Sequence, residues 1–530
     1  MSTAQSCQLS SLPDDIEALK QLVLDQQQAL VQKEQTIVNR EQRIAVLEEF
    51  IRLEKLRRFA ARSEKAPSQQ ELFNEAELSV AAEEALSPQE AQQQADPGST
   101  KKPSRPKPRR KPLPPEFPRV RVAHEVPAAD RQCSCGGERT AIGEETSEQL
   151  DIIPAKVRVL VNVRTKYACR QCENGVQTAP LPAQPIPKSK ASPGLLAHVA
   201  VAKYQDALPL YRQEALLKRS GVELPRHTLA NWMIKAGQLV QPLINLLADA
   251  LPSYPVLQCD ETRVQVLKEP DKPPTRHSYM WVRAGGPPTQ PIRLFHYADS
   301  RRGEVAQQLL GDYQGYLQTD DYGGYHACGA LQGVTHLGCW AHARRKFVDA
   351  QKASASAKSK TGKADLAVNM IGKLYAIERR IKDLASEQRY EIRQQEAVPQ
   401  LAKIRQWLDK TLHTTLPKGL LGKALAYLDK NWNKLTIYTE DGRLSIDNNT
   451  AENAIRPFVL GRKNWLFSAT VPGAKASANL YSLIETAKAN GLEPYAYLCQ
   501  VFKELPRAST VDQIESLLPW NLDQASLSTE

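Results

Sequence analysis

The sequence predicts a multidomain α+β protein, and three observations lead to this fold class. Its 530 residues exceed the length of one ordinary domain. Near the N-terminus an apolar residue recurs every seven positions, which is typical of a long helix in a coiled coil. Further along, short β-prone segments alternate with helix-forming stretches. We therefore expect an N-terminal coiled coil, a small β module, a helical region, and an α/β core interrupted by a helical insertion.

Residues 1–60 contain the long helix, which we expect to span residues 14–58. The apolar heptad positions are Ile16, Val23, Leu30, Ile37, Ile44 and Ile51. Such a stripe favours a leucine-zipper-like coiled coil between chains, and hence a homo-oligomer. The position three residues further on is less regular, so a lone amphipathic helix that packs on its own protein is the alternative.

Residues 61–118 have the composition of a linker. The first part is acidic and rich in Glu, Gln and Ala, and the last part, KKPSRPKPRRKPLPPEFP, places basic residues among closely spaced prolines. Proline removes backbone donors and favours extended chain, so no core is expected here. The basic arm either follows a phosphate backbone or is only a solvated spacer.

Two cysteine pairs in residues 119–180 indicate a small zinc-binding β module. The segment CSCGG contains Cys133 and Cys135, the segment CRQC contains Cys169 and Cys172, and the stretch between them is β-prone. Four thiolates make a closed Zn²⁺ site with a structural role. The first pair has the spacing C-x-C instead of the commoner C-x-x-C, and free thiols that bind no metal are the alternative.

Residues 181–250 are expected to be helical throughout. The segment LPLYRQEALLKRSGVELPRHTLANWMIKAG predicts two helices joined by a turn at Ser220-Gly221. This arrangement suits a helix-turn-helix that brings Arg226, His227 and Asn231 to DNA. A purely structural helical bundle is the alternative.

Residues 251–348 and 441–491 are the two parts of the expected α/β core. The segments YPVLQCDETRVQVL, SYMWVRAG, PIRLFHYADS and GYLQTDDY are β-prone, and CWAHARRKFVDA favours a helix. Residues 349–440 begin with low complexity and continue as charged amphipathic helices, which predicts an inserted helical subdomain. A last core helix is expected to stop at Gly491, before the C-terminal segment of residues 492–530.

Two of the predicted strands end in the same pattern, Leu-Gln-x-Asp followed by a second acid. In VLQCDE the acids are Asp260 and Glu261, and in YLQTDD they are Asp320 and Asp321. Because side chains alternate along a strand, neighbouring strands would direct Asp260 and Asp320 to one side at the same edge of the sheet. Glu261 and Asp321 would then turn away.

A third carboxylate, Glu452, lies in the segment IDNNTAENAIRP. On this segment alone, a structural role is favoured over a catalytic one. Asn449 as helix N-cap and Glu452 three residues later have the spacing of a capping box. An ion pair between Glu452 and Arg456, four residues further on, is a second structural alternative.

Together, the segments LQCDET, LQTDDYGGY, CWAHARRKF and NNTAENAIRPFVLGRKNWLF resemble the transposases of the insertion sequence 66 family, which are bacterial DDE recombinases. The resemblance covers nearly the whole chain. It implies a ribonuclease-H-like α/β catalytic core in addition to the zipper and the zinc module. By this similarity the catalytic triad consists of Asp260, Asp320 and Glu452. The family usually has a small residue after the second aspartate, whereas this chain has Asp321, which is therefore kept as a supporting candidate.

The activity implied by the resemblance is metal-dependent cleavage and joining of DNA. Three carboxylates suit two Mg²⁺ ions, with Mn²⁺ as a substitute, at the two ends of an in-line displacement at phosphorus. Cys339 and His342, in C-x-x-H spacing, are expected either to support this site or to pack beside it. The candidate DNA-binding residues are Arg344, Arg345, Lys346, Arg456, Arg462, Lys463, Arg226 and Asn231. For the residues near the acids, a solvated basic helix face is the alternative.

The net charge of +11 favours a polyanionic partner. The resemblance implies double-stranded DNA, both transposon ends and target, and small accessory proteins of the same element. No apolar run approaches the ~18 residues of a membrane span and no secretory signal is evident, so a bacterial cytoplasmic protein without a membrane partner is expected. Two alternative functions are a catalytically inactive, transposase-derived DNA-binding or regulatory protein and a ribonuclease-H-like nuclease without joining activity.

Overall fold

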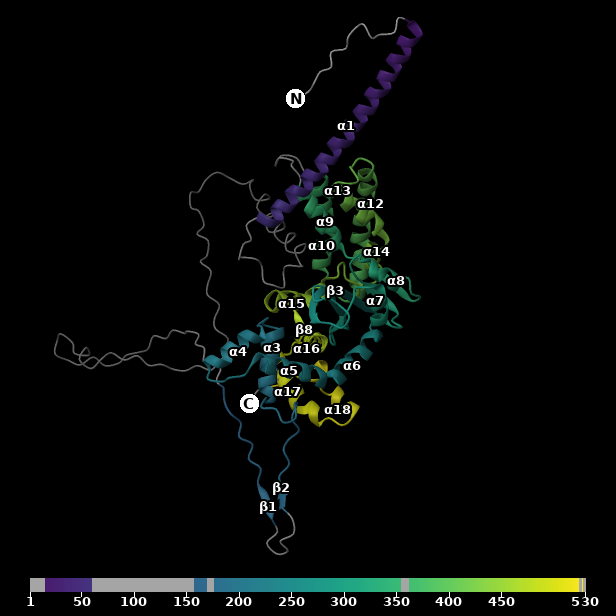
Figure 1. Ribbon diagram of the computed structural model, residues 1–530. Coiled ribbons are helices and arrows are strands. Elements are labelled where there is room, and N and C mark those ends of the chain that lie inside the picture. Colours follow the sequence, from purple (N-terminus) through teal and green to yellow (C-terminus); the bar gives the residue numbers. More distant parts are fainter. Residues whose placement is uncertain (1–14, 60–156, 169–175, 354–361, 524–526, 528–530) are drawn as a thin grey trace, which may run out of the picture. The chain divides into compact units, whose positions relative to one another are not determined.

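The structure is a computed structural model that describes residues 15–59, 157–168, 176–353, 362–523 and 527 (Figure 1). The described residues are mostly helical and include one mixed sheet, which agrees with the predicted mixture of helices and strands. The chain divides into two compact units, residues 89–163 and the remainder, and the elements below belong to the remainder. Among the helices of the described ranges, none is both long and apolar enough to cross a membrane.

The predicted N-terminal helix is confirmed as α1 (Ile16–Phe59). All six of its heptad residues are exposed, with exposed fractions between 52 and 69%. Near its C-terminus α1 packs on the helical insertion, where Leu53 is buried. There Glu49 accepts a hydrogen bond from the backbone N–H of Leu420 at 3.0 Å, and the ammonium of Lys423 lies 4.3 Å from the ring centre of Phe50.

The four cysteines of the predicted zinc module, Cys133, Cys135, Cys169 and Cys172, lie outside the described residues. Two short strands on either side of the second pair are described. These are β1 (Lys166–Ala168) and β2 (Val176–Thr178), which pair in antiparallel register.

The region predicted to be helical contains four helices among its described residues: α3 (Pro193–Tyr204), α4 (Leu210–Arg219), α5 (Arg226–Leu239) and α6 (Gln241–Ala250). The predicted turn at Ser220-Gly221 separates α4 from α5, and Gly221 takes a left-handed conformation (φ +81°) that favours glycine. A second glycine, Gly237, allows α5 to approach α16 (Val471–Ala489) closely. A Cβ at this position would lie 2.6 Å from the Cα of Ala476.

The core is a mixed sheet with the strand order β5-β4-β3-β6-β7. Its strands are β3 (Val256–Lys268), β4 (His277–Gly285), β5 (Ile292–Ala298), β6 (Gly315–Gln318) and β7 (Val334–Leu337). The pairs β3–β4 and β4–β5 are antiparallel, whereas β6 runs parallel to β3 and β7 runs parallel to β6. A further strand, β8 (Ser468–Thr470), pairs with the far end of β3. The four β-prone segments of the core are thus confirmed as strands.

The helices of the core share one apolar cluster with the sheet. They are α7 (Gly303–Leu310), α8 (His326–Gly329), α15 (Asn449–Trp465), α16 (Val471–Ala489), α17 (Pro494–Glu504) and α18 (Val511–Glu515). Of these, α15 packs on β3 and β4, and α16 packs on β5. As predicted, α16 ends just before Gly491, which has a positive φ of +77°.

The inserted region is helical, as predicted, and it has an apolar cluster of its own. Its helices are α10 (Lys363–Arg380), α11 (Ser386–Ile392), α12 (Val398–Leu412), α13 (Leu420–Lys430) and α14 (Trp432–Thr436). They pack with α9 (Trp340–Ala353), the helix predicted from CWAHARRKFVDA. Buried residues of α9 belong to this second cluster. The helix is continuous from Trp340 to Ala353, so it crosses the expected domain boundary between residues 348 and 349.

Candidate active site

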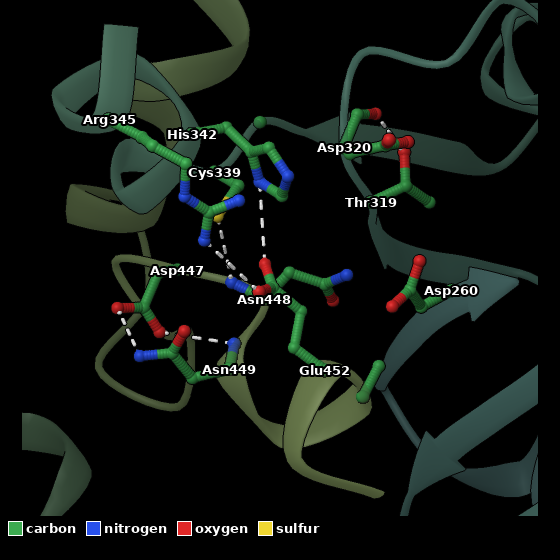
Figure 2. A network of polar contacts seen from close by, with 12 residues as sticks. Asp260, Thr319, Asp320, Cys339, His342, Arg345, Asp447, Asn448, Asn449 and Glu452 are labelled. Carbon is green, nitrogen blue, oxygen red and sulfur yellow. Dashed lines mark hydrogen bonds and ion pairs between the residues drawn. The ribbon is translucent and has the colours of Figure 1, made fainter. Parts of the chain in front are cut away.

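Three elements bring the three predicted acids to one place. Asp260 lies on β3, Asp320 follows the end of β6, and Glu452 lies in the first turn of α15. Because β3 and β6 are parallel neighbours with Gln258 opposite Gln318, the aspartate that follows each glutamine by two residues lies at the same level along the two strands. Only β6 ends at this pattern, since β3 continues to Lys268, and the predicted strand end at Asp260-Glu261 is wrong. Figure 2 shows the three carboxylates gathered there, each from a different element.

Burial dominates the electrostatics of this site. It raises the pKa of Asp260 well above its usual range, and the carboxylates of Glu261, Glu452 and Asp320 raise it further. Burial also raises the pKa values of Asp320 and Glu452. Like charges that are close together and poorly solvated disfavour ionisation, so a bound cation would stabilise the ionised site.

A pair of buried glutamines ties the three segments together. The side-chain amide of Gln258 donates to the side-chain oxygen of Gln318 (2.9 Å) and to the carbonyl of Asp447 (3.3 Å). Gln318 donates to the carbonyl of Ser445 (2.9 Å). The backbone N–H of Ala451 donates to Gln258 (3.2 Å). The glutamines of the repeated Leu-Gln-x-Asp pattern therefore hold both strands against the start of α15.

The second acid of each doublet turns away from the site, as strand register predicted. Glu261 pairs with Arg301 at 2.5 Å. Asp321 pairs with Lys430 of α13 at 2.9 Å and lies 3.3 Å from the imidazole of His326. Burial opposes ionisation of Asp321. Its hydrogen bonds to neighbouring side chains, above all the one from Lys430, nevertheless lower its pKa. Asp321 thus joins the core to the insertion.

The helix that carries Glu452 begins one residue earlier than predicted. Asn448 is the N-cap and Asn449 is the first helical residue. The side-chain amide of Asn448 donates to the carbonyl of Cys259 on β3 (2.9 Å), so this residue anchors the helix to the sheet. The predicted N-cap at Asn449 is therefore wrong, and the capping box between Asn449 and Glu452 does not form.

The carboxylate of Glu452 instead faces the start of α9 (Figure 2). The Nδ1 of His342 lies 3.4 Å from its Oε1, and the guanidinium of Arg345 lies 3.6 Å from its Oε2. The ligand atoms of Cys339, His342 and Glu452 all lie within 4.8 Å of one another. Burial lowers the pKa of His342 to about 4, and the nearby cations of Arg345 and Lys346 lower it further. This imidazole is therefore neutral at neutral pH.

The predicted DNA-binding residues fall into two groups. The first group is exposed or half-exposed and consists of Arg345, Lys346, Arg462, Lys463, Arg226 and Asn231. In contrast, Arg344 and Arg456 are only 9 and 7% exposed. Helical periodicity explains this difference, since Arg344 shares the inner face of α9 with Trp340 and Phe347, and Arg456 lies on the inner face of α15. These two side chains do not present themselves to DNA, contrary to the expectation.

Two residues that were not predicted also adjoin the acids. The guanidinium of Arg301 stacks 3.5 Å from the ring centre of Tyr322. The backbone N–H of Tyr322 donates to Asp320 at 3.0 Å. No sequence pattern points to Arg301, whereas Tyr322 belongs to the segment LQTDDYGGY on which the family resemblance rests.

Comparison with protein families gives four consecutive matches. Residues 46–122 match "Transposase C of IS166 homeodomain", and residues 130–173 match "zinc-finger binding domain of transposase IS66", a range that includes all four cysteines of the expected zinc module. Residues 188–476 match "Transposase IS66 family", and residues 482–520 match "IS66 C-terminal element".

Three similar proteins of Sinorhizobium fredii (strain NBRC 101917 / NGR234) are the uncharacterized proteins y4jD, y4qI and y4hP. The first is 35% identical over 77% of this chain and 81% of its own length. The second is 30% identical over 97% and 98%, and the third is 33% identical over 90% and 89%. No solved structure matches the chain significantly. Because the family model over residues 188–476 covers more than half of its length, the chain belongs to the IS66 family of transposases.

Proposed function

We propose that this protein transposes its own insertion sequence. It binds the terminal inverted repeats and carries out metal-dependent strand cleavage followed by strand transfer. The observation that supports this best is the gathering of Asp260, Asp320 and Glu452 from β3, the end of β6 and α15. Membership in the IS66 transposase family supports the same reading.

The chemistry of the site fits divalent metal ions. Its ligands are carboxylate oxygens, which Mg²⁺ prefers, and burial together with mutual repulsion leaves them in need of a cation. Asp260, Asp320 and Glu452 would hold two Mg²⁺ ions, for which Mn²⁺ is a substitute. When bound, such ions activate the attacking oxygen and stabilise the leaving 3′-oxygen of a phosphodiester.

The protein's own groups have positioning roles in this proposal. Gln258 and Gln318 hold the two aspartates and α15 in one arrangement. Arg345 and Lys346 are exposed beside the acids, where they would attract the phosphates of DNA. Asp321 supports the site through its ion pair with the insertion rather than as a metal ligand.

Other parts of the chain would recognise and pair the transposon ends. Arg226 and Asn231 are exposed on α5, the second helix of the predicted helix-turn-helix. The zinc-finger match supports a structural zinc ion on the four cysteines. The exposed heptad stripe of α1 supports a coiled coil between chains. Small accessory proteins of the same element complete the proposed set of partners.

We further propose a ribonuclease-H-like core within the predicted domain division, except that α9 continues past residue 348 into the insertion. The antiparallel β3, β4 and β5, followed by β6 and β7 in parallel with β3, support this assignment. Asp260 then lies on the central strand β3, and Asp320 directly follows the adjacent strand β6.

The proposal is tested with a DNA fragment that carries one end of the element, in the presence of Mg²⁺. We expect Asp260→Asn, Asp320→Asn and Glu452→Gln each to reduce strand cleavage by about a hundredfold or more, since each removes a charge that the transition state needs. Asp312→Asn is the matched control, because Asp312 is exposed and precedes β6.

Three outcomes have different meanings. Full cleavage by all three folded variants would exclude the triad. Cleavage by the unmodified protein without joining to a target would make it a nuclease. End binding without any metal-dependent cleavage would leave a DNA-binding regulator.

A further inference from the structure

Two metal-ligating side chains converge on Glu452, one of the three acids, in a combination that Mg²⁺ does not require, and the site that they form shares this carboxylate with the proposed Mg²⁺ site. They are Cys339 at the start of α9, His342 one turn later, and Glu452 on α15 (Figure 2). The sulfur, one ring nitrogen and one carboxylate oxygen all lie within 4.8 Å of one another. Cys339 is fully buried and Glu452 is 4% exposed, so water has little access to the ligand atoms.

Two of these atoms face each other without a satisfactory hydrogen bond. The Nδ1 of His342 and the Oε1 of Glu452 are 3.4 Å apart and both are buried. Within the described residues neither atom has a hydrogen-bond partner of acceptable geometry. With the imidazole proton on Nε2, a nitrogen lone pair would point at a carboxylate oxygen. A cation between the two atoms would satisfy both.

The sulfur is also held for ligation. The backbone N–H of Asn448, the N-cap of α15, donates to the Sγ of Cys339 at 3.3 Å. Hydrogen bonds of this kind fix the orientation of a metal ligand and support its ionised form. Arg345 pairs with Oε2 of Glu452, and its side chain is 45% exposed, so Oε1 is the oxygen directed at the cluster.

We propose that Cys339, His342 and Glu452 form a binding site for a borderline-soft divalent ion of the Zn²⁺ class. Sulfur and imidazole nitrogen are donors that Zn²⁺ and Co²⁺ prefer and that Mg²⁺ avoids. One thiolate and one carboxylate balance the two positive charges, and the imidazole contributes without charge. Three protein ligands leave the fourth tetrahedral position open for water or a phosphate oxygen. The nearby cations Arg345 and Lys346 weaken the site relative to a closed site of four thiolates.

The site is tested by Co²⁺ titration of the full-length chain in which the four cysteines of the zinc module are replaced by serine. We expect one Co²⁺ per chain, with the visible bands of tetrahedral cobalt and a near-ultraviolet thiolate-to-cobalt band, and full displacement by Zn²⁺. Cys339→Ser should abolish the thiolate band, and His342→Gln should weaken Co²⁺ binding by at least about tenfold. Cys328→Ser is the matched control, because Cys328 is an equally buried thiol outside the cluster, and it should leave the band unchanged.

A second measurement uses the chain with its zinc module intact. Its zinc content should be two ions per chain and should fall to one in Cys339→Ser. The proposal is overturned if the chain without the four module cysteines folds natively but gives no thiolate-to-cobalt band. It is also overturned if the band persists when Cys339→Ser is added, or if the zinc content of the chain with an intact module does not depend on Cys339. Neither measurement involves DNA, so loss of this site and loss of the proposed transposase activity can be told apart.

Discussion

Asp260 lies on the central strand of the sheet with Glu452 and Asp320 within electrostatic reach, and burial raises its pKa well above its usual range. A group whose pKa is higher in the folded state favours folding below its unfolded value of about 3.9, and this contribution is lost as pH rises through the folded pKa. Above the folded pKa and without metal, the ionised carboxylate therefore opposes folding.

We expect Asp260→Asn to stabilise the Mg²⁺-free protein while it removes activity. At pH 8 the melting temperature should rise by about 2 °C or more, which corresponds to roughly 1 kcal/mol for a domain of this size. The gain should shrink as pH falls through the raised folded pKa, because Asp260 then becomes protonated in the parent. Calorimetry across this pH range checks the prediction, with Asp312→Asn as the exposed control. A lower melting temperature for Asp260→Asn at pH 8 would contradict it.

The glutamine pair gives a second prediction, in which positioning is separated from stability. Gln318→Leu removes the shorter of the two hydrogen bonds that the Gln258 amide donates and the bond that Gln318 donates to the carbonyl of Ser445, at a cost of about 1–3 kcal/mol. Because the same bonds hold the acids in place, the Mg²⁺ concentration that supports half-maximal cleavage should also rise by about tenfold or more.

Gln213→Leu is the control for this effect. Gln213 is also buried, and it donates to two backbone carbonyls away from the acids, those of Val199 and Leu208. This variant should lose stability without any change in the Mg²⁺ requirement. A shift in the Mg²⁺ requirement for both variants would show that the loss comes from general loosening and not from the glutamine pair.

The local pattern predicted that Asp260 and Asp320 lie side by side, because side chains alternate strictly along a strand and the two residues occupy equivalent positions. It did not reveal that Arg344 is buried, because its burial depends on how α9 packs against an insertion that follows it in the sequence. The cap of α15 was misplaced for a similar reason. Asn448 and Asn449 have the same side chain, and the local sequence does not reveal the distant partners that hold Asn448 before the helix, the carbonyl of Cys259 and the sulfur of Cys339.

At the scale of elements, the insertion is connected to the loop that follows β6 through Asp321. This carboxylate, whose side chain is 13% exposed, pairs with Lys430 on α13 and lies 3.8 Å from Lys434 on α14. The sequence predicted that the insertion is helical from its amphipathic pattern. The sequence held no information on the contact between Asp321 and the two lysines, because they are more than a hundred positions apart and lysines are common on solvated helices.

Asp321→Asn should therefore behave differently from Asp320→Asn. We expect a stability loss of about 1 kcal/mol at pH 7, because the ion pairs are partly solvated, and cleavage within a few-fold of the parent. The pKa of Asp321 is lowered, so its contribution is present above the unfolded value of about 3.9 and is lost as pH falls through the folded pKa. Denaturant unfolding at pH 7 and in acid measures this, and a Mg²⁺-dependent cleavage defect equal to that of Asp320→Asn would make Asp321 a metal ligand.

At the scale of the whole molecule, α1 has two different surfaces. Its C-terminal end is anchored on the insertion through Leu53 and Glu49, whereas the heptad residues from Ile16 to Ile51 are exposed. A chain that keeps six large apolar residues in one exposed row on a single helix loses hydrophobic stabilisation unless another helix covers them. This combination favours self-association through α1 with the core held at one end of the coil.

The corresponding prediction concerns Ile37→Lys combined with Ile44→Lys. Each isoleucine contributes about 1.5–3 kcal/mol when buried, so two substitutions in each of two chains should weaken self-association by about a thousandfold or more. Light scattering on the eluted full-length protein should then show a monomer where the parent is an oligomer. Gln28→Lys combined with Gln42→Lys adds the same charge at exposed positions off the stripe and should leave the oligomer intact. If the isoleucine variant remains an oligomer, the chains associate through another surface, and the exposed stripe of α1 then requires a different partner, for which an accessory protein of the same element is the natural candidate.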